Sequence, residues 1–169
     1  MRTYMVKKVP IPEKSIASRY LPQVHFYDAY RVLLPDKGDA DVKHIAIEFL
    51  SAAPSWVDTL MNVRNQIVSL IGLKTSSRNK ENLIIEEGGK IGIFRVLQCS
   101  PNEIVLGEDD RHLDFRVSIF VEKVNDSNYL TVSTLVYYNN WVGKSYFFIV
   151  KRFHKLIVPA MLKNMKYIW

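Results

Sequence analysis

The chain has 169 residues, of which 48% are hydrophobic and 24% are charged, a composition typical of a globular protein rather than a disordered segment. Its single cysteine, Cys99, excludes an internal disulfide and a multi-cysteine zinc site. No apolar run is long enough to span a membrane, and the N-terminus lacks the apolar stretch of a signal peptide. We therefore expect a single cytoplasmic domain over residues 1–169.

The net charge of +6 is unevenly distributed. Residues 1–20 and 142–169 are basic, and the second of these segments contains no acidic residue, whereas residues 21–141 carry an excess of acids. In one interpretation the cationic ends pack near the anionic middle of the chain. In the other they form a cationic surface that faces phosphate groups of nucleic acid or lipid.

The first half of the chain predicts an arm, a strand and two helices. Prolines punctuate the start, aromatic and branched residues then run up to Pro35, and two later stretches place apolar residues at the helical period. Asp39 or Asp41 can cap the first helix, and Gly72 can end the second. The expected elements are an extended arm (1–22), a strand (23–34) and two helices (42–50 and 55–71).

The second half of the chain predicts antiparallel strands followed by one long helix. Apolar and polar residues alternate with a period of two, and turn residues separate the alternating runs. The last 27 residues return to the helical period and carry a wide apolar stripe. The expected strands are 83–85, 91–97, 103–106, 113–121 and 129–138.

A sheet with one apolar face must bury that face, and only the last helix is long enough to cover it. The sequence therefore predicts an α+β helix-grip fold. In this fold a curved antiparallel sheet wraps around a long C-terminal helix, and the two short helices after the first strand close one end. A cleft between sheet and helix would suit an apolar ligand.

Seven segments carry a family resemblance. The most specific is Gly107–Arg116, which reads Gly-Glu-Asp-Asp-Arg-His-Leu-Asp-Phe-Arg. The other six are Phe26–Tyr30, Pro54–Val57, Leu60–Asn65, Gly72–Lys74, Gly143–Phe147 and Phe153–His154. They resemble an uncharacterised bacterial family of the START-related (SRPBCC, helix-grip) superfamily, and the resemblance extends over about residues 9–162. Arg152 departs from this pattern, because the family favours proline before the Phe-His pair. The resemblance implies the superfamily's fold and its binding of apolar small molecules between sheet and helix, but no particular reaction.

The charged segment before and within the strand at 113–121 is a candidate site. If the strand begins at Asp110, then Asp110, His112, Asp114 and Arg116 share one face. They form either a solvated outer face, with ion pairs of about 0–1 kcal/mol each, or a polar patch in the cleft that orients a ligand's headgroup. His112 with Asp110 or Asp114 would also suit proton transfer. A metal site built from these residues and His154 is a further alternative, but we expect neither a metal nor a cofactor.

Six further residues are candidates for ligand binding. Each lies on an element that is expected to border the cleft. Asp28 stands among apolar neighbours, so it lies either at a sheet edge or paired in the interior. The tryptophan and arginine of the second helix could act as a lid and an anion anchor; otherwise they are a core residue and a snorkelling side chain. The six residues are Asp28, Tyr30, Trp56, Arg64, Tyr146 and His154.

The sequence as a whole predicts a module that binds an apolar or amphipathic small molecule, such as a lipid. The alternative is a cyclase- or isomerase-like acid–base enzyme of the same fold that uses His112 with Asp110 or Asp114. No motif for reading nucleic acid is present, so we expect no nucleic-acid partner. The basic last helix leaves room for peripheral contact with a membrane. The sequence leaves open the ligand and the oligomeric state.

Overall fold

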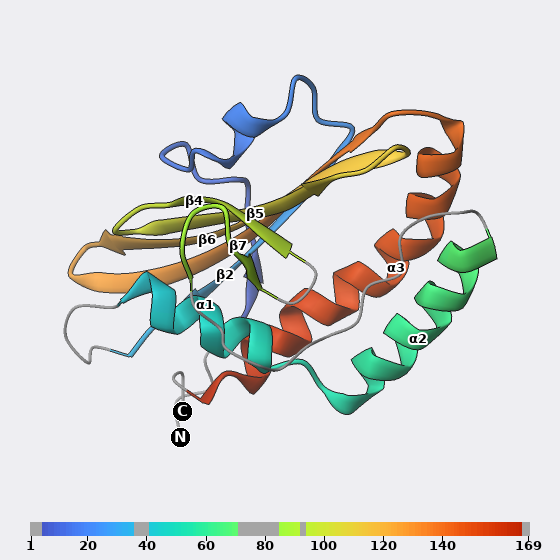
Figure 1. Cartoon of the computed structure of the whole chain (residues 1–169). Coiled ribbons are helices and arrows are strands. Elements are labelled where there is room, and N and C mark those ends of the chain that lie inside the picture. Colours follow the sequence, from blue (N-terminus) through green and yellow to red (C-terminus); the bar gives the residue numbers. More distant parts are fainter. Residues whose placement is uncertain (1–4, 36–40, 71–84, 92–93, 167–169) are drawn as a thin grey trace.

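The structure is a computed structural model that describes residues 5–35, 41–70, 85–91 and 94–166 (Figure 1). It has the predicted α+β helix-grip architecture, with a curved seven-stranded antiparallel sheet and the long helix α3 across one of its faces. The order of the strands is β1-β2-β7-β6-β5-β4-β3. The elements are β1 (Lys7–Lys8), the short 3-10 helix η1 (Ala17–Tyr20), β2 (Phe26–Leu33), α1 (Val42–Ser51), α2 (Ser55–Leu70), β3 (Lys90–Ile91), β4 (Phe94–Cys99), β5 (Glu103–Asp109), β6 (Leu113–Val124), β7 (Ser127–Tyr138) and α3 (Trp141–Asn164).

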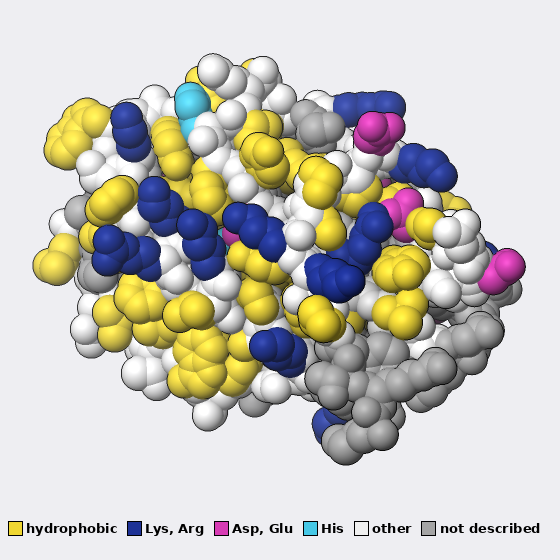
Figure 2. Space-filling model, turned by 180° about the vertical axis from the view of Figure 1, so that it is seen from behind, with side chains coloured by type: hydrophobic (Ala, Val, Ile, Leu, Met, Phe, Trp, Pro, Cys, Tyr) yellow, Lys and Arg dark blue, Asp and Glu magenta, His cyan; other side chains and the backbone are white. Residues whose placement is uncertain are grey.

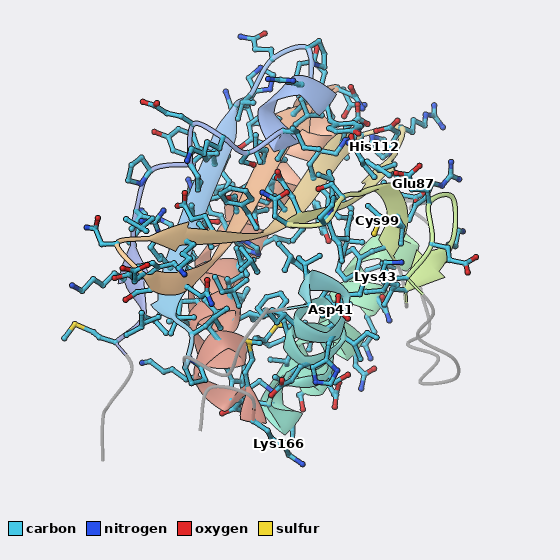
Figure 3. All side chains as sticks on the ribbon, turned by 90° about the vertical axis from the view of Figure 1, so that its left-hand side faces the viewer. Asp41, Lys43, Glu87, Cys99, His112 and Lys166 are labelled. Carbon is cyan, nitrogen blue, oxygen red and sulfur yellow. The ribbon has the colours of Figure 1, made fainter. Side chains whose placement is uncertain are left out.

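The helices begin where the sequence supplies caps. The side chain of Asp41 accepts a hydrogen bond of 3.0 Å from the backbone N–H of Lys43, so Asp41 is the N-cap of α1 (Figure 3). In the same way, the side chain of Asn140 accepts a bond of 3.1 Å from the N–H of Gly143 and caps α3. The strand predicted at residues 83–85 falls largely outside the described residues.

The sheet has a helix face, covered by α1 and α3, and an outer face on the other side (Figure 1). Strand alternation places Leu113, Phe115 and Val117 of β6 on the helix face, and Asp114 and Arg116 on the outer face. The main core lies on the helix face. It includes Ile45 and Phe49 of α1, Val158 and Leu162 of α3, and Ile104, Ile119, Leu130 and Val132 of the sheet.

The outer face is covered by the N-terminal arm (Figure 1). Ala17 and Leu21 pack against Leu135 of β7. Beside them the carboxylate of Glu103, only 2% exposed, accepts hydrogen bonds from the hydroxyls of Ser15 and Ser118, both at 2.6 Å, and from the N–H of Ile16 at 3.0 Å. Both faces of the sheet are therefore covered, and within the arm predicted at residues 1–22 the described segment from Ser15 to Leu21 contributes to the second cover. No helix in the described part of the chain is long and apolar enough to cross a membrane.

Candidate functional site

A buried carboxylate lies on the helix face of the sheet. Asp28 of β2 is 1% exposed and pairs in register with Thr134 of the neighbouring strand β7. Because side chains alternate along a strand, Asp28 shares this face with Phe26 and Tyr30. Of the two locations that the sequence left open for Asp28, the structure selects the interior.

His154 of α3 lies over this carboxylate. Its ring nitrogen Nε2 is 3.3 Å from Asp28 Oδ1 and 3.0 Å from Thr134 Oγ1, and its side chain is 19% exposed. We call Asp28, Thr134 and His154 the Asp28 site. The second carboxylate oxygen, Asp28 Oδ2, is buried and has no hydrogen-bond partner among the described residues. A buried polar atom left without a partner costs about 1–3 kcal/mol, so the folded chain bears an energetic cost here.

Aromatic and apolar side chains surround the Asp28 site. Phe26 packs against Phe147 of α3, with ring centroids 4.9 Å apart, and Val136 belongs to the same cluster. Burial raises the pKa of the Tyr30 phenol, and the nearby negative charge of Asp28 raises it further. The site therefore combines hydrogen-bonding groups with a dry, mainly apolar wall.

The wall continues across the helix face toward β4. Val117 is the register neighbour of Thr134, and Phe115 is the register neighbour of Val136. Phe94, Phe115 and Val117 are only half-buried, so this part of the helix face is less completely covered than the main core. Glu108 lies beside Phe115, and its Oε2 atom is a second buried carboxylate oxygen without a partner within the described ranges.

The charged segment that the sequence singled out forms a structural corner at the β5–β6 turn. Asp114 Oδ1 accepts hydrogen bonds from the N–H of Asp110 at 3.1 Å and from the side-chain amide of Asn139 at 2.9 Å. The carboxylate of Asp110 accepts from the N–H of His112 at 3.1 Å, and His112 Nδ1 lies 3.1 Å from Asn140 Oδ1. These bonds tie the turn to the cap of α3.

Two glycines explain why this corner has such a particular sequence. A Cβ atom at Gly107 would lie 2.5 Å from the carbonyl oxygen of Phe115, and one at Gly143 would lie 2.6 Å from the carbonyl carbon of His112. Both distances are well inside van der Waals contact, so only glycine fits. The most specific motif of the sequence therefore marks a close approach of the turn, the neighbouring strand and the helix terminus.

Two predicted ligand-binding residues lie away from the Asp28 site. Asp114 and Arg116 are on the outer face, so of the two alternatives that the sequence left open the structure matches the one outside the cleft, and their part in binding a ligand stays a prediction. Arg116 Nη2 instead forms an ion pair of 2.7 Å with Asp109. The alternation correctly placed these residues on one face. It could not say which face, because both faces of this sheet are covered.

The remaining candidates have mixed outcomes. Tyr30 lines the Asp28 site, and Tyr146 packs at the edge of the aromatic cluster beside Phe147. Trp56 is 41% exposed at the start of α2, and the side chain of Arg64 lies outside the described part of the structure. Sequence reasoning missed Thr134. Its signal was a polar residue opposite Asp28, which becomes visible only once the strand register is known.

The alternative metal site is not assembled. No group of three or more His, Cys, Asp or Glu side chains that could hold a metal ion occurs within the described residues. The two histidines of that alternative lie far apart, one beside the N-terminus of α3 and the other in the middle of that helix. His112 contacts the cap at Asn140, and His154 lies about 20 Å farther along the helix at 1.5 Å per residue.

Comparison with known families gives one match. The family described as "Protein of unknown function (DUF2867)" matches residues 20–161, a range that includes the Asp28 site and the corner. The chain belongs to this family. A search of curated proteins gave no match for this DUF2867 chain. Among solved structures, it is similar to the crystal structure of CalU16 from Micromonospora echinospora, with 13% identity and a TM-score of 0.27 over 97% of this chain and 90% of that one.

Proposed function

We propose that this protein binds an apolar small molecule with a hydrogen-bond-donating end, a hydroxyl or an amine, between the helix face of the sheet and α3. The observation that carries the proposal is the buried Asp28 Oδ2 atom beside the partly accessible His154, because no described residue forms a hydrogen bond with that oxygen. A carboxylate oxygen can only accept, so a ligand that completes it must donate. Glu103 on the outer face shows how this chain satisfies a structural carboxylate, with three hydrogen bonds.

The apolar part of the ligand would lie on the half-buried face beyond Thr134. Strands are spaced about 4.8 Å apart, so Val117 and Phe115 on β6 lie two strands, or roughly 10 Å, from Asp28 on β2. This length suits a hydrocarbon chain or a small ring system. Apolar pockets with a few convergent polar groups are the usual form of small-molecule sites. The resemblance to the START-related superfamily, whose members bind apolar molecules in this region, supports the same proposal.

The proposal can be tested with three probes that share a hydrocarbon chain, namely 1-dodecanol, dodecylamine and dodecanoate. Calorimetric titration should show binding of the alcohol and the amine and much weaker binding of the carboxylate, because Asp28 repels a second anion. Asp28→Asn should remove the difference in affinity between dodecylamine and dodecanoate. Asp109→Asn, a matched loss of charge at a residue with a 69% exposed side chain on the outer face, should leave that difference intact. Failure of all three probes to bind, or an equal effect of both variants, would count against the proposal.

A second candidate, acid–base catalysis, is favoured by the pairing of Asp28 with His154. The carboxylate holds one ring nitrogen and leaves Nδ1, which has no partner among the described residues, to accept a proton. His112, to which the sequence assigned this role, lies apart from the Asp28 site, with its Nδ1 atom against Asn140 Oδ1 at the α3 cap, and stays an untested alternative. Deuterium exchange at the α-carbon of 2-tridecanone in D₂O tests this candidate. The wild type should accelerate the exchange and His154→Gln should not, and a wild-type rate equal to that of buffer rules the reaction out.

A further inference from the structure

The side of α3 that faces away from the sheet is unusually apolar for a surface helix. It carries five large exposed hydrophobic residues, Trp141 (77% exposed), Phe148 (56%), Ile149 (50%), Phe153 (41%) and Leu156 (63%). Contiguous apolar surface of this kind commonly marks an interaction site. The opposite side of the same helix contributes Phe147 and Val158 to the buried clusters, whereas the five exposed residues belong to none of these clusters.

The same side of α3 is also cationic. It carries Lys144, Lys151, Arg152 and Lys155, and α3 contains no acidic residue. None of the four forms an ion pair within the described residues. Lys151 Nζ lies 4.8 Å and the Arg152 guanidinium 5.9 Å from the ring centroid of Phe148. Figure 2 views the molecule from this side and shows Lys and Arg side chains interspersed with hydrophobic ones, with few acidic groups among them.

The two kinds of side chain form neighbouring rows. At about 100° per residue, Lys144, Lys151 and Lys155 fall within one narrow sector of the helix. Ile149 and Leu156 fall together in a second sector, separated from the lysines by the sector of Phe148 and Trp141. A partner of this face must therefore be anionic and must also accept apolar side chains. The charge interpretation in which the cationic ends pack against the anionic middle of the chain does not describe these four cations, because they lie on the side of α3 that faces away from the sheet.

We propose that this face of α3 docks on the surface of an anionic lipid bilayer. The lysines would contact the lipid phosphates, and the aromatic and aliphatic side chains would enter the boundary between headgroups and acyl chains, the arrangement of interfacial amphipathic helices. Nucleic acid would match the charges but leave the apolar row exposed to water. An apolar protein partner would bury that row but leave the cations uncompensated. The proposal stands independently of the Asp28 site, which lies on the opposite side of the helix.

Vesicle co-sedimentation tests the proposal. The two vesicle types are phosphatidylcholine mixed with phosphatidylserine and phosphatidylcholine alone, and the protein should bind only the first strongly, with binding weakened by salt. Each lysine near an anionic surface contributes roughly a fivefold change in partitioning, so the double variant K151A/K155A should bind roughly 25-fold more weakly. The control K43A/K90A makes the same change in net charge at two exposed lysines of α1 and β3, outside the cationic face of α3, and should shift binding by less than about twofold.

The apolar row needs its own variant. L156S should weaken binding at every salt concentration, and addition of anionic vesicles should shift the fluorescence of Trp141 to shorter wavelength, a shift that W141F abolishes. Equal weakening by the two lysine pairs would overturn the proposal. So would binding to heparin or RNA without binding to vesicles, or a dimer that buries this face and is disrupted by L156S.

Discussion

Asp28 and Glu103 are two carboxylates buried to the same degree, 1% and 2% exposed, on opposite faces of one sheet. They differ in their partners. Glu103 accepts three hydrogen bonds of 2.6, 2.6 and 3.0 Å, whereas Asp28 has contacts on one oxygen and none on the other among the described residues. We predict that replacing Glu103 by leucine lowers the free energy of unfolding, whereas replacing Asp28 by leucine does not lower it.

The expected magnitudes follow from the groups that each change leaves behind. Glu103→Leu leaves the N–H of Ile16 and one of the two serine hydroxyls without an acceptor, since the hydroxyls lie 3.4 Å apart and one can donate to the other; at about 1–3 kcal/mol each, stability should fall by about 2 kcal/mol or more. Asp28→Leu removes the unpaired oxygen, and His154 keeps its contact with Thr134 Oγ1 at 3.0 Å. An apolar side chain of similar shape among Phe26 and Tyr30 should leave stability unchanged or raise it by about 1–3 kcal/mol.

Urea unfolding followed by tryptophan fluorescence, with linear extrapolation to water, measures both changes. The m-value should be unchanged in each variant, which would show that the same surface is exposed on unfolding. If Asp28→Leu lost as much stability as Glu103→Leu, Asp28 would be a structural anchor like Glu103. The reasoning that assigns it to a ligand would then be refuted.

Three further predictions concern the corner and the aromatic wall. Gly143→Ala should destabilise the fold by about 2 kcal/mol or more despite the better helix propensity of alanine, because the added Cβ displaces the backbone at His112; an unchanged urea midpoint would contradict this. Asn140→Ala removes the α3 cap and the contact with His112, and should cost about 1–2 kcal/mol in the same assay, whereas a loss below a few tenths would contradict the capping role. The pKa of Tyr30 is raised above 10.0 by burial and then by Asp28, so its contribution to stability is complete below pH 10 and is lost as the pH rises through the folded-state value. Asp28→Leu should lower that pKa, as read from ultraviolet titration against a Tyr30→Phe reference, and an unchanged titration would contradict the proximity of the two groups.

The sequence predicted the fold well because periodicity carries most of that information. The alternating runs gave β6 and β7, and the apolar stripe gave α3 nearly to its ends. The cover of the outer face was not predicted. The arm is held there by one buried carboxylate, two serines and a few apolar contacts, and nothing in a proline-punctuated segment indicates which surface it will meet.

The candidate site was predicted only in pieces. Asp28 and His154 are 126 positions apart, and their meeting depends on the register of β2 against β7 and on the rotation of α3 about its axis. Neither quantity is encoded in the local pattern. The two residues were therefore treated as separate candidates, and the Thr134 hydroxyl that completes the group was missed.

The motif that looked most functional instead marks the tightest packing, and the reason applies beyond this chain. A ligand-binding segment and a tightly packed turn can both require a string of glycines and charged residues, so residue types alone do not distinguish a binding site from a structural turn. The degree of hydrogen-bond satisfaction does separate them. The carboxylates of Asp110 and Asp114 accept bonds from backbone and side-chain amides, and Glu103 accepts three bonds, so these three groups have little left to offer a ligand. Among the described residues Asp28 Oδ2 is a buried acceptor without a partner, as is Glu108 Oε2, and the ligand site that we propose rests on the Asp28 acceptor rather than on the density of charge in the sequence.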